Sequence, residues 1–313
     1  MFLREAYAMT TDQMRALLNA DPRAVLEGDR QRYFDQITRA ADVIAANAEQ
    51  RPIVLLAGPS GSGKTTTALL IERELERRGL GTHTLQMDHY FAPLTKEELA
   101  LLKENKLDLE KPSRVDGPFF REQLGQILRG EAVELPRYDF RESKRVFDGH
   151  ILQRKPGEIV IMEGIHALNP EVSGYKDQTT RVYVSVRTRV TAHDGEVLHP
   201  SKIRLARRIL RDSTGRGRTI LDTVGMKEKV DAGEVKYIMP YKPNAHIDID
   251  TFYSAELAVY RPFLLEGLRG ILHLYPELED LTRIISEFPD IPDSYVPSDS
   301  LLREFIGGSE LAY

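Results

Sequence analysis

Short apolar runs alternate along the chain with longer stretches whose apolar positions recur every three or four residues. A continuous apolar run is typical of a strand buried on both faces of a sheet, whereas helical spacing indicates an amphipathic helix. The predicted strands cover 53–57, 82–87, 159–162, 181–186 and 246–250. The predicted helices cover 64–78, 119–128, 203–212 and 255–271. This alternation predicts an α/β fold with a mainly parallel sheet flanked by helices.

Both ends of the chain lie outside this alternation. Ile37, Ala40, Ala41 and Ile44 recur at helical spacing, and Pro52 ends their segment. Residues 275–313 also read as helical, interrupted by a proline-rich turn. We therefore expect a helical N-terminal extension over 1–50, a central α/β domain over 51–274 and a helical C-terminal appendage over 275–313.

Composition and charge narrow the functional classes. The 313 residues include 43 Lys and Arg against 48 Asp and Glu, so the net charge of -5 disfavours a protein that coats nucleic acid. With no cysteine, disulfides, thiolate zinc sites and cysteine nucleophiles are excluded. No apolar run approaches the roughly 18–20 residues that span a bilayer, and residues 1–10 lack the apolar stretch of a secretory signal. We expect a cytoplasmic protein with no membrane partner.

A glycine-rich turn carries the strongest chemical signal. Residues 58–65, Gly-Pro-Ser-Gly-Ser-Gly-Lys-Thr, match G-x-x-x-x-G-K-[ST] between a predicted strand and a predicted helix. Glycines let backbone N–H groups turn towards phosphate oxygens, and the helix presents its positive end to the same anion. Lys64 is placed to reach the β- and γ-phosphates, and the Thr65 hydroxyl to bind Mg²⁺. The pattern predicts a P-loop NTPase fold that binds ATP or GTP.

Two acidic residues follow predicted strands. If 82–87 lies beside the first strand, Asp88 stands at the sheet's carboxyl edge near the loop, where it could accept a proton from an attacking hydroxyl. Glu163 ends an apolar run, as a Walker B acid would, and could hold Mg²⁺. A turn or helix cap is the alternative role for Asp88, and a solvated turn acid the alternative for Glu163.

Arginines are concentrated in residues 201–218. Arg204, Arg207, Arg208 and Arg211 fall within an arc of roughly 100° on a helix whose opposite side is apolar. We predict a lid that presents these guanidinium groups to a polyphosphate. A solvated basic helix paired with surface acids is the alternative.

Taken together, these segments resemble the uridine kinase/phosphoribulokinase family of P-loop kinases over about residues 51–272. The similarity is greatest to the bacterial uridine kinase-like branch, without the TGS domain that often precedes it. The similar segments are GPSGSGKTT (58–66), MDHYF (87–91), LPRYDF (135–140), IVIMEGIHAL (159–168), LARRILRDSTGRGR (205–218), the pair Pro240-Tyr241 and LLREFIGGS (301–309).

The resemblance implies roles for individual residues. Asp88, Lys64 and Arg211 would be catalytic, with Asp88 the general base. The triphosphate would be bound by Gly58, Ser60, Gly61, Ser62, Gly63, Lys64, Thr65, Thr66, Arg216 and Arg218. The acceptor would be bound by Asp116, Tyr138, Arg208 and Arg211. Mg²⁺ would be held by Thr65, Glu163 and Asp88.

The chain departs from the family pattern on the acceptor side. Uridine kinases usually follow the Tyr-Asp-Phe segment with a His-Ser-Arg group, and residues 141–145 contain no histidine. The aromatic pair after Asp88 is also reversed, to Tyr90-Phe91. We expect an ATP- and Mg²⁺-dependent kinase that phosphorylates a hydroxyl of a uridine- or cytidine-like nucleoside. The alternatives are a kinase of another sugar-containing or alcohol metabolite, a nucleotide-binding regulator and a nucleic-acid-linked P-loop protein. A homo-oligomer is compatible with each.

Overall fold

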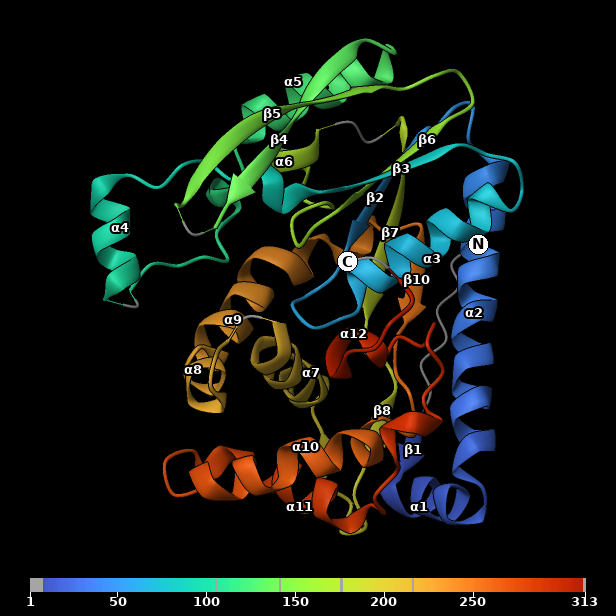
Figure 1. The fold of residues 1–313 in the computed structure, drawn as a ribbon, viewed down its shortest axis with the longest axis vertical. Coiled ribbons are helices and arrows are strands. Elements are labelled where there is room, and N and C mark those ends of the chain that lie inside the picture. The colour runs from blue at the N-terminus through green and yellow to red at the C-terminus, as the bar shows by residue number, and fades with distance from the viewer. Residues whose placement is uncertain (1–7, 105, 141, 175–176, 216, 312–313) are drawn as a thin grey trace.

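The computed structural model describes residues 8–104, 106–140, 142–174, 177–215 and 217–311. At its centre is a five-stranded parallel sheet with the order β10-β7-β2-β6-β3 (Figure 1). Its strands are β2 (Ile53–Ala57), β3 (Thr82–Gln86), β6 (Ile159–Glu163), β7 (Thr179–Ser185) and β10 (Ile247–Asp250). The predicted parallel α/β sheet is confirmed. The strand predicted at 82–87 does not lie beside the first strand, because β6 lies between β2 and β3.

Both faces of this sheet are buried, which explains the continuous apolar runs. In β2, Val54 and Leu56 point into one core cluster, while Ile53, Leu55 and Ala57 point into another. This is the two-residue period of a strand with cover on each side. The first cluster is covered by α2 (Pro22–Ala46), α3 (Lys64–Glu76), α7 (Pro200–Gly215) and α10 (Glu256–Ile271). The second is covered by α5 (Gly117–Leu128) and a hairpin of β4 (Ala132–Asp139) and β5 (Lys144–Gln153).

Helical segments flank the sheet region of the chain on both sides. The N-terminal one forms α1 (Thr11–Ala20) and α2, and the C-terminal one forms α11 (Glu279–Glu287) and α12 (Arg303–Ile306). Their buried side chains, among them Leu26, Leu281 and Phe305, belong to the same cluster as the sheet residues Val54 and Val182. These flanking helices are therefore part of the core around the sheet.

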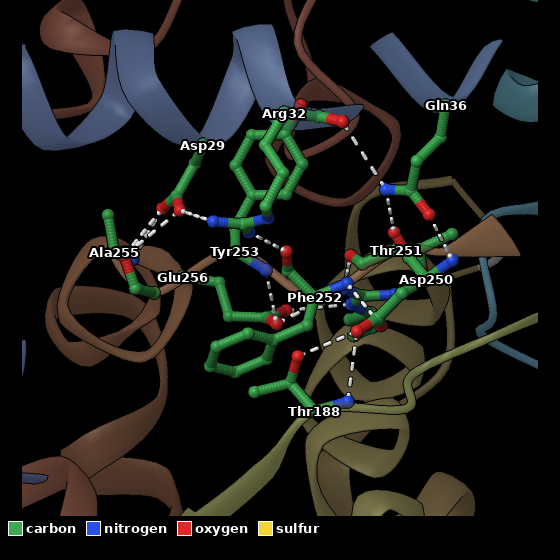
Figure 2. A network of polar contacts seen from close by, with 12 residues as sticks. Asp29, Arg32, Gln36, Thr188, Asp250, Thr251, Phe252, Tyr253, Ala255 and Glu256 are labelled. Atoms are coloured by element: carbon green, nitrogen blue, oxygen red, sulfur yellow. Dashed lines mark hydrogen bonds and ion pairs between the residues drawn. The ribbon is translucent and has the colours of Figure 1, made fainter. Parts of the chain in front are cut away.

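A buried polar network fastens α2 to the turn after β10 (Figure 2). The carboxylate of Asp29 accepts hydrogen bonds from the Ser254 hydroxyl at 2.9 and 3.0 Å and from the Ala255 N–H at 3.1 Å. Burial raises the pKa of Asp29. The Gln36 amide bonds both backbone groups of Asp250, at 2.9 and 3.0 Å. These contacts fix the turn that leads into α10.

Several smaller elements complete the chain and lie outside the predicted pattern. They are β1 (Ala8–Thr10), α4 (Lys96–Lys103), α6 (Pro170–Ser173), β8 (Arg189–Thr191), β9 (Val197–Leu198), α8 (Ile220–Gly225), α9 (Lys227–Gly233) and a π-helical turn at Glu234–Ile238. The hairpin and α5 lie at one end of the molecule, and α1, α10 and α11 at the other (Figure 1). Within the described part of the chain, no helix combines the length and apolar character needed to cross a bilayer.

Candidate active site

Three parallel strands bring the predicted residues to one edge of the sheet. Leu56 pairs in register with Glu163, and Glu163 pairs with Gln86 on the far side. The glycine-rich loop follows β2, and Asp88 lies two residues beyond Gln86 in a short 3₁₀ turn. Because the carboxyl ends of parallel strands share an edge, the loop and both acids lie around one site.

The loop at residues 58–63 has the backbone that its glycines predict. Gly61 and Gly63 have φ values of 75° and 84°, in the left-handed region where a side chain is strained. A Cβ at Gly58 would lie 2.0 Å from the Val184 carbonyl oxygen, so the loop packs directly on β7. Gly63 precedes α3 and makes no side-chain cap, which leaves N–H groups of the first turn for an anion. The Lys64 ammonium donates to the Pro59 carbonyl at 3.3 Å.

Thr65 and Glu163 meet at the base of the loop. The Thr65 hydroxyl donates to Glu163 Oε1 at 2.9 Å. Glu163 is buried, and that burial raises its pKa to about 7, with the charge of Asp88 adding to the rise. A buried carboxylate of this kind suits a cation. Among the described residues no three His, Cys, Asp or Glu side chains form a metal cluster. A hydroxyl and one carboxylate still fit Mg²⁺, which takes its other ligands from phosphate oxygens and water.

Two cavities of about 520 and 470 Å³ open beside this loop. Ser60, Asp88, Glu110 and Arg211 border both. The smaller cavity also reaches Lys64, Thr65 and Glu163. Asp88 therefore borders the space next to the phosphate loop.

The predicted lid helix is α7, and it packs on the loop. A Cβ at Gly61 would lie 2.8 Å from the Arg204 carbonyl oxygen and 3.1 Å from Arg208 Cγ. Arg211 donates to the Ser60 hydroxyl at 3.5 Å. Arg208, Arg211 and Arg218 border the larger cavity, whereas Arg216 lies outside the described residues.

The expectation that all four arginines of the stripe face the site is wrong. Arg207 is fully buried and pairs with Glu256 at 2.7 Å, and it donates to the Gly61 carbonyl at 3.3 Å. Arg204 is also buried and pairs with Glu234. The helix is covered on nearly every side, so the stripe divides into two structural arginines and two that border a cavity.

Neither Asp116 nor Tyr138 borders either cavity. Asp116 caps α5 and accepts a hydrogen bond from Arg145 at 2.9 Å. Tyr138 is buried and its ring packs edge-on against Phe91, which does border the smaller cavity. Direct contact of either residue with an acceptor is an expectation that this geometry does not support.

Sequence reasoning missed several residues of the cavities. Glu110 borders both, and Lys229 the larger one. Burial raises the pKa of Glu110 to about 7. Glu304, from α12, borders the smaller cavity and accepts a hydrogen bond from the Thr66 hydroxyl. The similarity of LLREFIGGS to the family branch was the only signal for Glu304, and the loop around Glu110 matches no motif.

A family model and curated relatives match this chain. The model of the Phosphoribulokinase / Uridine kinase family matches residues 53–258. The uridine kinase of Lactobacillus johnsonii is 33% identical over 174 residues, covering 55% of this chain and 72% of the relative. That of Ligilactobacillus salivarius is 28% identical over 229 residues, covering 72% of this chain and 97% of the relative.

One solved structure shares the fold at low sequence identity. It is a candidate fructose transport system kinase from Silicibacter, which superposes with a TM-score of 0.52 and 17% identity. The match covers 68% of this chain and 98% of that one. It supports the P-loop kinase fold alone.

Proposed function

The chain belongs to the phosphoribulokinase / uridine kinase family, and from that premise we propose that it transfers the γ-phosphoryl group of ATP to a hydroxyl of a uridine- or cytidine-like nucleoside. The observation that carries the proposal is one cavity bordered by Lys64, Thr65, Asp88 and Glu163. Phosphoryl transfer requires positioning and charge neutralisation more than covalent chemistry by the protein. These four residues supply a cation, a hydroxyl and two carboxylates for that task.

The triphosphate would lie in the loop at 58–63. Backbone N–H groups of the loop and of the first turn of α3 would bind its oxygens, and the Lys64 ammonium would leave the Pro59 carbonyl to bind the β- and γ-phosphates. Thr66 lies in the first turn of the same helix and would lie near the phosphate chain.

Mg²⁺ would be held by Thr65 and Glu163, and when bound it would neutralise charge on the phosphates. Their 2.9 Å contact already brings the hydroxyl and the carboxylate together. Asp88 borders the same cavity and would assist as a further oxygen ligand or through water.

Asp88 would also orient the acceptor hydroxyl and accept its proton during transfer. Arg211 and Arg208 border the larger cavity from α7, where they would stabilise the charge of the transferring group. Arg218 lies on the same side, and the described part of the lid would keep out water, which is a competing acceptor.

The test is ADP release from ATP and Mg²⁺ in the presence of a panel of nucleosides, sugars and phosphosugars, with products identified by mass. We expect release that depends on uridine or cytidine and a product heavier by one phosphoryl group. If the chain binds ATP but no compound stimulates release, the kinase proposal is wrong and a nucleotide-binding regulator remains.

A second acceptor class is favoured by one specific observation. Residues 142–145 contain no histidine, and Arg145 is bound to Asp116 and stacks on Phe119, with its guanidinium 4.4 Å from the ring centre. Asp116, which the family resemblance assigns to the acceptor, is therefore already paired with Arg145. Release stimulated by another sugar-containing or alcohol metabolite in the same panel would identify this second function.

A further inference from the structure

A carboxylate from the far end of the chain reaches the phosphate cavity. Glu304 lies in α12 and borders the same cavity as Lys64 and Thr65. One of its oxygens, Oε2, accepts a hydrogen bond from the Thr66 hydroxyl in the first turn of α3. Its other oxygen accepts no hydrogen bond from any residue that the structure describes. One acceptor is thus left at the edge of the site.

The segment that carries Glu304 is held firmly on the loop. A Cβ at Gly63 would lie 2.5 Å from Leu301 Cδ1, so this side chain closes on the loop itself. Phe305 is fully buried in the main core cluster. Arg303 donates two hydrogen bonds to the Val296 carbonyl, at 2.7 and 3.2 Å. The position of Glu304 is therefore set by packing on both sides of it.

A carboxylate at this position is unexpected on electrostatic grounds if the site binds only phosphate. An uncompensated carboxylate beside a polyphosphate raises the free energy of the bound state through like-charge repulsion. Lys64 and Arg211 border the cavity, but Asp88, Glu110 and Glu163 already add three acids to it. A fixed carboxylate becomes favourable when the ligand itself brings hydrogen-bond donors.

The nucleotide that supplies the phosphoryl group carries such hydrogen-bond donors at a distance from its γ-phosphate. Asp88 marks the end of the cavity where transfer would occur. Thr214 and Gly215, at the end of α7, border the same cavity together with Glu304. A nucleoside attached to the phosphates carries ribose hydroxyls, and a protein carboxylate commonly accepts their hydrogen bonds.

We propose that Glu304 binds the ribose hydroxyls of the donor nucleotide, so that the C-terminal segment completes the donor site and selects ribonucleotides. The proposal rests on the use of ATP proposed above. It assigns a binding role to a segment that lies beyond the residues matched by the family model.

The test compares three ligands by isothermal titration calorimetry in the presence of Mg²⁺. They are ATP, 2′,3′-dideoxy-ATP and inorganic tripolyphosphate, which lacks a ribose. Glu304→Gln keeps an oxygen for the Thr66 hydroxyl but removes the charge. The matched control is Glu310→Gln, whose carboxylate pairs with Arg73 on the surface at 2.8 Å.

We expect Glu304→Gln to weaken ATP binding by about ten- to a hundredfold, the effect of losing a charged hydrogen bond. In Glu304→Gln the affinity for tripolyphosphate and for dideoxy-ATP should not fall. Glu310→Gln should match wild type for all three ligands. Equal losses for ATP and tripolyphosphate, tighter ATP binding, or unchanged ATP binding would each overturn the proposal.

A second test uses only the wild-type protein, so it does not depend on whether a variant folds. Equal affinity of wild type for ATP and dideoxy-ATP would overturn the role of Glu304, while ATP binding and the proposed kinase function would stand. If wild type bound neither ATP nor tripolyphosphate, the proposed function itself would fail, and this role of Glu304 with it.

Discussion

Replacing Arg207 with methionine should strongly destabilise the protein. Both Arg207 and its partner Glu256 have side chains that are 0% exposed. The guanidinium donates to Glu256 at 2.7 and 3.1 Å, to the Thr251 carbonyl at 2.6 Å and hydroxyl at 3.0 Å, and to the Gly61 carbonyl at 3.3 Å. Arg207→Met leaves the carboxylate of Glu256 buried without its counter-charge.

Breaking a buried ion pair from one side costs about 3–5 kcal/mol. A domain's free energy of unfolding is about 5–15 kcal/mol, so we expect a large fall in the urea midpoint measured by circular dichroism. The double variant Arg207→Met, Glu256→Leu should recover much of the loss, because no charge then remains buried. Arg269→Met is the control, since its pair with Glu266 is exposed and should contribute about 0–1 kcal/mol. The reasoning is refuted if Arg207→Met matches this control, or if the double variant is no more stable than the single one.

Two further predictions concern the acids of the site. Asp88→Asn should keep ATP affinity in calorimetry while lowering acceptor-dependent ADP release by about 10²–10⁴-fold, the usual contribution of a positioned base; unchanged turnover would remove Asp88 from that role. Burial raises the pKa of Glu110 from 4.5 to about 7. At a pH between these two values, the folded protein keeps a proton on Glu110 that the unfolded chain has released. The contribution of Glu110 to the free energy of unfolding therefore falls as the pH rises from about 5 to 7, by up to a few kcal/mol. Glu110→Gln should match wild type in thermal unfolding near pH 5 and exceed it near pH 8, and an equal difference at both pH values would contradict this assignment.

The apolar runs predicted the sheet because its strands are buried on both faces. Ile159–Met162 is continuous for this reason, and the loop motif sits where β2 ends. Strand order was harder to predict, because nothing within 82–87 says which neighbour it pairs with. The hairpin was not predicted from periodicity, since Pro136 and Gly149 interrupt its strands and much of β5 is exposed.

Side-chain roles were predicted only where local sequence determines them. Helical periodicity placed Arg207 and Arg208 in one arc, but their burial depends on α7 packing between the loop and α10. Glu304 reaches Thr66 across 238 positions of sequence, a separation at which no spacing rule operates. Asp116 and Tyr138 were placed by resemblance, and nothing in the sequence around them predicts their contacts with Arg145 and Phe91.

The flanking helices share one core with the sheet, and this limits how far the protein can be shortened. The family model matches residues 53–258, which excludes all of α2 and most of α10. A fragment cut at those limits would expose the side of the sheet that Ile37 and Ile44 cover and would deprive Ser254 of its partner Asp29. Such a fragment should aggregate rather than give a smaller working enzyme. Expression of the catalytic segment, and any transplant of it into another scaffold, must therefore carry the flanking helices with it.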